Sequence, residues 1–197
     1  MVSSQPTLQA DALQEVHVFW LAGMSCDGCS ISTIGATSPT AESLMLGIIP
    51  GVPKIVLHHP VLSVEAGEDF MEPFHKASRG EFDKQFVVVF EGSVANERLN
   101  DKNGGYFSGL GTRLIDGEAQ PFPTADLLGL MAPHAAAVIA IGTCATWGGV
   151  PAAAGNVTGS MGLMDFLGEN YRSTLGLPVV NIPGCAPQGP SLMLPMT

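Results

Sequence analysis

The chain has 197 residues and a net charge of −10, with 46% hydrophobic and 13% charged side chains. This length suits one domain with a sizeable core, and so apolar a composition excludes an intrinsically disordered protein. The eight basic residues are scattered and form no basic stripe that could bind nucleic acid, so nucleic acid is not expected as a partner. No apolar run approaches the roughly 18–20 residues of a membrane helix, so no transmembrane segment is expected.

Short β-branched runs alternate along the chain with segments of helical character. Strands are predicted at 16–21, 54–58, 85–91, 136–141 and 178–182. Helices are predicted as one or two pieces within 30–47 and at 69–78, 124–131 and 160–171. The helix at 124–131 is expected to be capped by Thr124 or Asp126. A long Gly-rich connection is predicted over 100–123. This alternation indicates an α/β fold, with a mostly parallel five-stranded sheet covered by helices on both faces.

The last third of the chain is poor in charge. Between residues 131 and 197 the charged side chains are only Asp165, Glu169 and Arg172. Two interpretations fit this composition. This part either forms a buried central sheet with Gly- and Ala-rich turns, or lies under a large, permanent and apolar subunit interface.

The N-terminal residues 1–15 form a polar tail without the twin arginines or the apolar stretch of a secretory leader. A cytoplasmic location is therefore expected. In that compartment the four cysteines of the chain are more often metal ligands or catalytic thiols than disulfides.

All four cysteines follow predicted strands. Cys26 and Cys29 lie in the loop after the first strand, Cys144 directly after the fourth, and Cys185 directly after the fifth. The carboxyl ends of parallel strands meet at one edge of a sheet, which is where open α/β sheets bind ligands. We therefore expect the four thiols on one rim.

Three kinds of site use such thiols: a redox-active dithiol, a structural zinc and an iron–sulfur cluster. A zinc site usually has a second closely spaced cysteine pair, which is missing here, whereas a cluster tolerates very uneven ligand spacing. The surroundings favour the cluster, because glycines let backbone amides approach sulfur. These glycines are Gly23, Gly28, Gly142, Gly148, Gly149 and Gly184.

Other candidate residues carry less information. Glu91 ends the third strand on the same rim, as either a proton-carrying carboxylate near the site or an ordinary turn carboxylate. His58 and His59 point to opposite sides of a strand, so they are expected to be boundary residues and not a metal pair. The acidic run 65–72 is expected to be a solvated helix start.

Four segments, at 18–30, 89–93, 141–149 and 181–187, resemble the small subunit of NiFe hydrogenases. The resemblance covers residues 16–189 and implies a flavodoxin-like domain that receives electrons from hydrogen oxidation. It implies that Cys26, Cys29, Cys144 and Cys185 hold the proximal iron–sulfur cluster, [4Fe–4S] with four thiolates or [3Fe–4S] if one stays unbound. Glu91 and Thr143 would lie beside it.

The same resemblance implies partners. The NiFe centre would belong to a large subunit, so no catalytic residue is expected in this chain. We also expect a downstream electron acceptor of the ferredoxin or quinone type, a higher oligomer of heterodimers, and membrane association only through partners.

The chain departs from the family in three respects. Ser25 stands where many members have a glutamate, and the twin-arginine leader is absent, which suggests a cytoplasmic or uptake-type enzyme. The segment 190–197 diverges and the family's second cluster domain is missing, as expected of a truncation, a frameshift or a natural one-cluster protein. The alternative functions are the cluster-bearing 20 kDa-type subunit of NADH–quinone oxidoreductase, which carries two adjacent cysteines where this chain has Cys26-Asp-Gly-Cys29, and a scaffold domain with a structural metal.

Overall fold

The computed structural model of the chain describes residues 15–100 and 105–188. The divergent segment 190–197 and the polar tail, except for residue 15, lie outside the described residues. The strands are β1 (Glu15–Ala22), β2 (Lys54–His58), β3 (Phe86–Glu91), β4 (Gly109–Ile115), β5 (Glu118–Pro123), β6 (Ala137–Ile141) and β7 (Val180–Ile182). The α-helices are α1 (Gly28–Ile34), α2 (Ala41–Met45), α3 (Gly67–Ser78), α4 (Thr124–Met131), α5 (Gly142–Trp147) and α6 (Leu163–Leu167).

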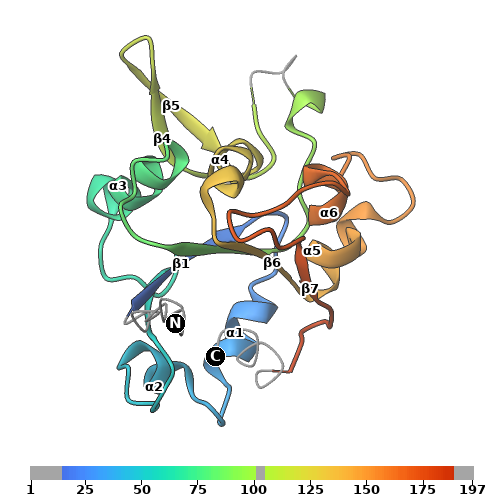
Figure 1. Cartoon of the computed structure of the whole chain (residues 1–197). Coiled ribbons are helices and arrows are strands. Elements are labelled where there is room, and N and C mark those ends of the chain that lie inside the picture. The colour runs from blue at the N-terminus through green and yellow to red at the C-terminus, as the bar shows by residue number, and fades with distance from the viewer. Residues whose placement is uncertain (1–14, 101–104, 189–197) are drawn as a thin grey trace, which may run out of the picture.

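The main sheet has five parallel strands in the order β2-β1-β3-β6-β7 (Figure 1). Counted along the chain without the separate β4–β5 pair, this is the order 2-1-3-4-5 of flavodoxin-like folds. The order reverses at β1, whose last residue pairs with the end of β3 (Ala22 with Glu91). The predicted fold class is therefore confirmed, and the reversal point of the sheet lies at the predicted rim.

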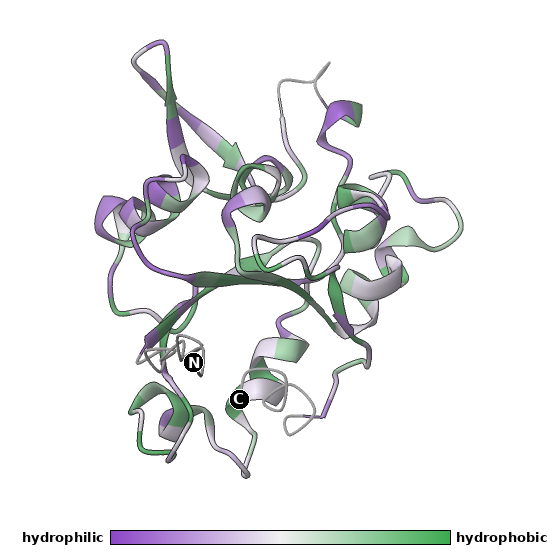
Figure 2. Cartoon of the chain, viewed as in Figure 1, coloured by the Kyte–Doolittle hydropathy of each residue, from purple (hydrophilic) through white to green (hydrophobic). Residues whose placement is uncertain are grey.

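The central strands are apolar along most of their length (Figure 2), and nearly all residues of β3 and β6 are buried. Such continuous apolar runs are typical of strands that are covered on both faces of a sheet. Side chains alternate along each strand, so Phe19 packs on one side with Phe74 and Leu128 from α3 and α4. On the other side, Trp20 packs with Leu44 from α2. Figure 1 shows α1 and α2 on one face and α3, α4 and α6 on the opposite face. Among the described residues, no helix is long and apolar enough to cross a membrane.

The predicted connection over 100–123 is wrong, because most of it forms the antiparallel hairpin β4–β5. The hairpin turns at Asp116 and Gly117, which both have positive φ (54° and 84°). An Asp-Gly pair is the preferred sequence for a two-residue turn with positive φ at both positions. Gly109, Gly111 and Pro121 weaken the strand pattern on either side of that turn.

Smaller differences concern helix ends. The helix predicted at 160–171 is only Leu163–Leu167, and it ends at Gly168, whose φ is 88°. The predicted cap of α4 by Thr124 or Asp126 is wrong, since Pro123 occupies the N-cap and no side chain caps the helix. The short helix α5, which carries Cys144, was not predicted. The predicted bounds of β2 and α4 agree with the structure.

Candidate metal centre

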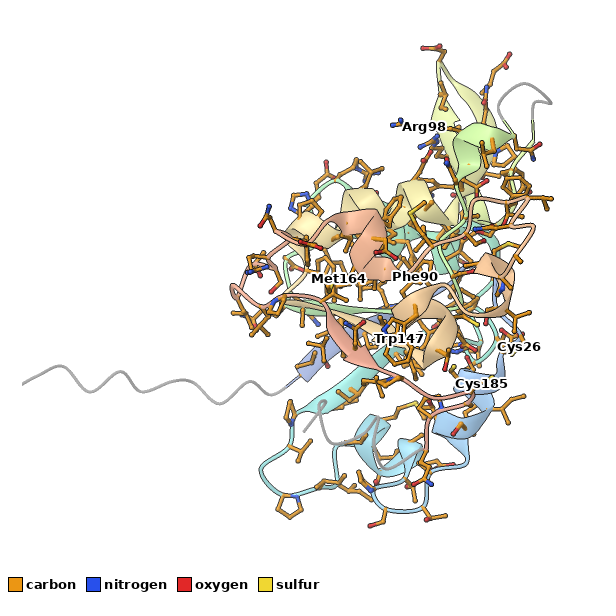
Figure 3. All side chains as sticks on the ribbon, turned by 90° about the vertical axis from the view of Figure 1, so that its right-hand side faces the viewer. Cys26, Phe90, Arg98, Trp147, Met164 and Cys185 are labelled. Atoms are coloured by element: carbon orange, nitrogen blue, oxygen red, sulfur yellow. The ribbon has the colours of Figure 1, made fainter. Side chains whose placement is uncertain are left out.

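The structure brings the four cysteines together around one small cavity at the carboxyl end of the sheet. Cys26 precedes helix α1 and Cys29 lies in its first turn, Cys144 lies in α5 directly after β6, and Cys185 follows β7. Figure 3 shows Cys26 and Cys185 at the same edge of the molecule. The cavity is also lined by Ser25, Gly28, Glu91, Gly92, Gly142, Thr143, Gly184 and Ala186.

The backbone at this rim is bent where each strand passes into its loop. Asp27 adopts a left-handed conformation (φ 59°) between the first two cysteines. At the end of β6, Gly142 has φ 87° and starts α5 without an intervening loop. The Thr143 N–H donates to the Gly184 carbonyl oxygen at 2.9 Å, so the helix with Cys144 is tied to the loop before Cys185. Thr143 thus contributes to the site through its backbone.

Three of the six predicted glycines lie against cysteine sulfurs. A Cβ atom on Gly142 would lie 2.5 Å from Cys29 Sγ, and one on Gly149 would lie 2.5 Å from Cys144 Sγ. A Cβ on Gly28 would lie 3.3 Å from Cys26 Sγ. The cavity walls are therefore shaped so that backbone closely approaches sulfur, as thiolates of a bound cluster require.

The remaining predicted glycines serve packing elsewhere. The backbone of Gly23 lies against the Ser93 carbonyl oxygen, Gly148 lies against Ala152, and Gly184 lies against Pro187. Their predicted approach to sulfur is not seen. They hold the loops that carry the cysteines.

Burial raises the pKa of two of the four thiols, Cys29 and Cys144. Burial, followed by the charges of Glu91 and the other three cysteines, raises the pKa of the Cys29 thiol to about 12. Burial also raises the pKa of Cys144, although the Val150 backbone N–H donates to its sulfur and opposes the shift. A coordinated cation deprotonates a thiol outright. A positively charged group between the thiols would therefore favour the thiolate forms of Cys29 and Cys144.

The spacing of the four cysteine sulfurs differs from that of a site for a single ion. A lone zinc would need its sulfurs at about 2.3 Å from one point. Within residues 15–100 and 105–188, no three His, Cys, Asp or Glu side chains form such a group. The four cysteines instead line one cavity, and a glycine lies against the sulfur of Cys26, Cys29 and Cys144.

Glu91 is almost fully buried (1% exposed) beneath this cavity. Its Oε1 accepts the backbone N–H of Cys29 at 3.0 Å. Its Oε2 accepts the indole N–H of Trp20 at 3.0 Å and the hydroxyl of Ser30. A buried carboxylate with three donors is a built part of the site and not an ordinary turn residue.

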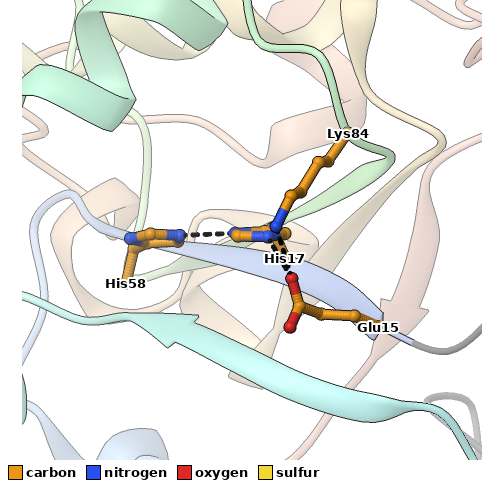
Figure 4. A network of polar contacts seen from close by, with 4 residues as sticks. All are labelled: Glu15, His17, His58 and Lys84. Atoms are coloured by element: carbon orange, nitrogen blue, oxygen red, sulfur yellow. Dashed lines mark hydrogen bonds and ion pairs between the residues drawn. The ribbon is translucent and has the colours of Figure 1, made fainter.

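His58, the last residue of β2, and His59, which follows it, point to opposite sides, as predicted. His58 stacks on Phe19 and joins a polar network with His17, Glu15 and Lys84 (Figure 4). His59 is not the ordinary boundary residue that the sequence indicated, because it is buried and contacts Ser30. Strand alternation could have found it, since residue 59 shares the face of Ile55 and Leu57, which is the α1 side.

The surface beside the cysteines is apolar and exposed. Trp147 and Val150, which follow Cys144, are 66% and 84% exposed, and Ile31 in α1 is 69% exposed. The interpretation as a buried central sheet is confirmed for β6, whereas the subunit interface stays a prediction. Strand β6 is buried in the sheet, whereas the segment after it presents large apolar side chains to the outside.

The family model described as "NADH ubiquinone oxidoreductase, 20 Kd subunit" matches residues 26–194. The fold is similar to an actinobacterial-type NiFe-hydrogenase from Ralstonia eutropha H16, with a TM-score of 0.87 and 49% identity over 94% of this chain and 52% of that one. The Hydrogenase-2 small chain of Escherichia coli K12 is 37% identical, over 88% of this chain and 40% of the relative. The periplasmic [NiFeSe] hydrogenase small subunit of Desulfomicrobium baculatum is 30% identical, over 90% and 52%. The chain thus spans about half the length of the curated relatives it matches.

Proposed function

Because this chain belongs to the family of the NADH ubiquinone oxidoreductase 20 kDa subunit, we propose that it is an electron-transfer subunit, and specifically that of a NiFe hydrogenase oxidising hydrogen. The observation that carries the proposal is the convergence of Cys26, Cys29, Cys144 and Cys185 around one cavity. The similar proteins described above are hydrogenases or their small subunits, which supports this choice within the family.

The alternative is the cluster-bearing subunit of NADH–quinone oxidoreductase, which the family description itself supports. Two residues separate Cys26 from Cys29, whereas that subunit carries adjacent cysteines at this place. The hydrogenase assignment is favoured for this reason.

The residues present fit an iron–sulfur cluster, and the four cysteines would hold it. When bound, such a cluster takes up and releases electrons one at a time. Four thiols favour [4Fe–4S], and [3Fe–4S] would leave one thiol unbound. Gly142 and Gly149 make room for the sulfurs, and Glu91 orients the Cys29 backbone.

The NiFe centre belongs, in this proposal, to a large subunit bound at the apolar surface of Trp147 and Val150. No catalytic residue is assigned to this chain. We also propose a downstream acceptor and a domain spanning 16–189. The cytoplasmic location stays a prediction, because one similar small subunit is named periplasmic.

Replacing Cys144 with alanine tests the assignment. Cys144→Ala should lower the iron and sulfide content of the purified chain and abolish hydrogen-dependent dye reduction by the complex. Thr146→Ala is the matched control on the same helix, since that buried hydroxyl has no hydrogen-bond partner among the described residues. Full iron and full activity in Cys144→Ala, or zinc in place of iron in the wild type, would contradict the proposal.

A further inference from the structure

A series of hydrogen bonds runs from His59 to the backbone of Cys29. His59 is 2% exposed and lies beside Trp20, with 5.1 Å between the ring centroids. Its Nε2 is 2.9 Å from Ser30 Oγ, and the Ser30 hydroxyl donates to Glu91 Oε2 at 2.5 Å. Oε1 of the same carboxylate accepts the Cys29 N–H at 3.0 Å. Three linked side chains thus connect the end of β2 to the segment that carries the Cys29 thiol.

The hydrogen bonds in this series converge on Glu91 from both ends. The backbone N–H of Val61 donates to His59 Nδ1 at 3.1 Å, so this nitrogen is an acceptor and the neutral ring carries its proton on Nε2. His59 therefore donates to Ser30, and the Ser30 proton is left for Glu91. Every donor is directed toward the carboxylate. A fully satisfied buried network of this kind holds its members in a single arrangement.

We propose that His59 is a positioning residue for the Cys29 ligand: through Ser30, it holds the Glu91 carboxylate where that carboxylate orients the Cys29 backbone. The inference rests on the function proposed above, because it concerns the group that Cys29 would hold. Hydrogen bonds behind a ligand and charges near a cluster tune its reduction potential. A carboxylate fixed beside Cys29 opposes the uptake of an electron there, so a loosened carboxylate raises the reduction midpoint.

His58 provides a matched control because it is the same residue type one position earlier. It lies on the opposite face of the sheet, with its ring stacked on Phe19 at 4.4 Å between centroids. Its Nε2 contacts His17 Nδ1 at 2.9 Å (Figure 4). A substitution at 58 therefore perturbs the same strand end without touching the bonds to Glu91.

The test measures the reduction midpoint and the electron paramagnetic resonance spectrum of the full chain, purified anaerobically in its complex. His59→Leu should keep its iron but show shifted and broadened resonance lines, because the carboxylate loses its single arrangement. Its reduction equilibrium constant should rise about tenfold, which is 59 mV for one electron. His59→Gln, whose side-chain amide can still donate to Ser30, should restore the wild-type midpoint, and His58→Leu should not move it.

The outcomes separate the two proposals. Iron in every variant with a wild-type midpoint and spectrum for His59→Leu would overturn the role of His59 alone. A wild-type chain without iron would overturn the proposed function together with this inference. If His59→Leu does not fold, Ser30→Ala cuts the same series from helix α1, and an unchanged midpoint in that variant also overturns the inference.

Discussion

Replacing Gly142 with alanine should prevent the proposed iron–sulfur cluster from binding without unfolding the sheet. The new Cβ would lie 2.5 Å from Cys29 Sγ, whereas ordinary nonbonded contacts begin at about 3.5 Å. The sulfur must therefore retreat by roughly 1 Å, which is about five times the ±0.2 Å tolerance of a metal–ligand distance. The positive φ of Gly142 (87°) adds about 1–2 kcal/mol of backbone strain to the same variant.

Gly117→Ala separates these two effects. Gly117 has φ 84° at the tip of the hairpin, and an added Cβ would meet nothing within 4 Å. This control should lose a similar 1–2 kcal/mol of unfolding free energy in a urea titration and keep its full iron content. Gly142→Ala should lose most of its iron. Equal iron in the two purified variants would refute the inference that Gly142 makes room for a ligand sulfur.

Two further predictions concern the surface and the pH dependence. Trp147→Ser should weaken binding to the large subunit about 30-fold, or about 2 kcal/mol, and leave the unfolding midpoint unchanged. The control variant Val64→Ser changes a side chain that is 95% exposed and distant in sequence from Trp147, so it should bind like the wild type. Equal binding by both variants would contradict the docking surface. Burial lowers the pKa of His58 to about 4, so the unfolded chain takes up a proton near pH 6.5 that the folded chain does not. The neutral, buried His58 therefore lets the protein keep its full stability above pH 6.5, and the free energy of unfolding falls as the pH drops from 6.5 toward 4. Urea midpoints should decline over this range less steeply in His58→Phe than in the wild type. Parallel curves for the two proteins would contradict the lowered pKa of His58.

Much of the fold could be predicted because the sheet is buried on both faces. Strands such as β3 and β6 are then continuous apolar runs, which stand out from any polar surrounding. The hairpin could not be found in this way, because β4 and β5 are largely exposed and contain glycine and proline. Its one local signal was the Asp116-Gly117 turn.

The candidate site could be predicted to the extent that topology determines it. Parallel strands put Cys26, Cys144 and Cys185 at one edge whatever their side-chain packing. The hydrogen bonds that hold the Cys29 segment in place depend on how helix α1 packs against the sheet, and the spacing of residues in the sequence does not predict this packing. For this reason the strand pattern predicts that Glu91 lies at the rim, but it does not predict the hydrogen bond from Ser30 to Glu91 or the contact of Ser30 with His59.

The contribution of the last strand to the site has a consequence for biosynthesis. Cys185 follows β7 and is 159 positions after Cys26, so at about 5–20 residues per second the first thiols leave the ribosome roughly 8–30 s before the last one. During that interval the proposed ligand set would be incomplete, and a metal captured by Cys26 and Cys29 would lack its other two ligands. Loading of the proposed cluster would therefore be completed only after β7 has been synthesised, so the iron content of a nascent chain would report that translation has passed residue 185.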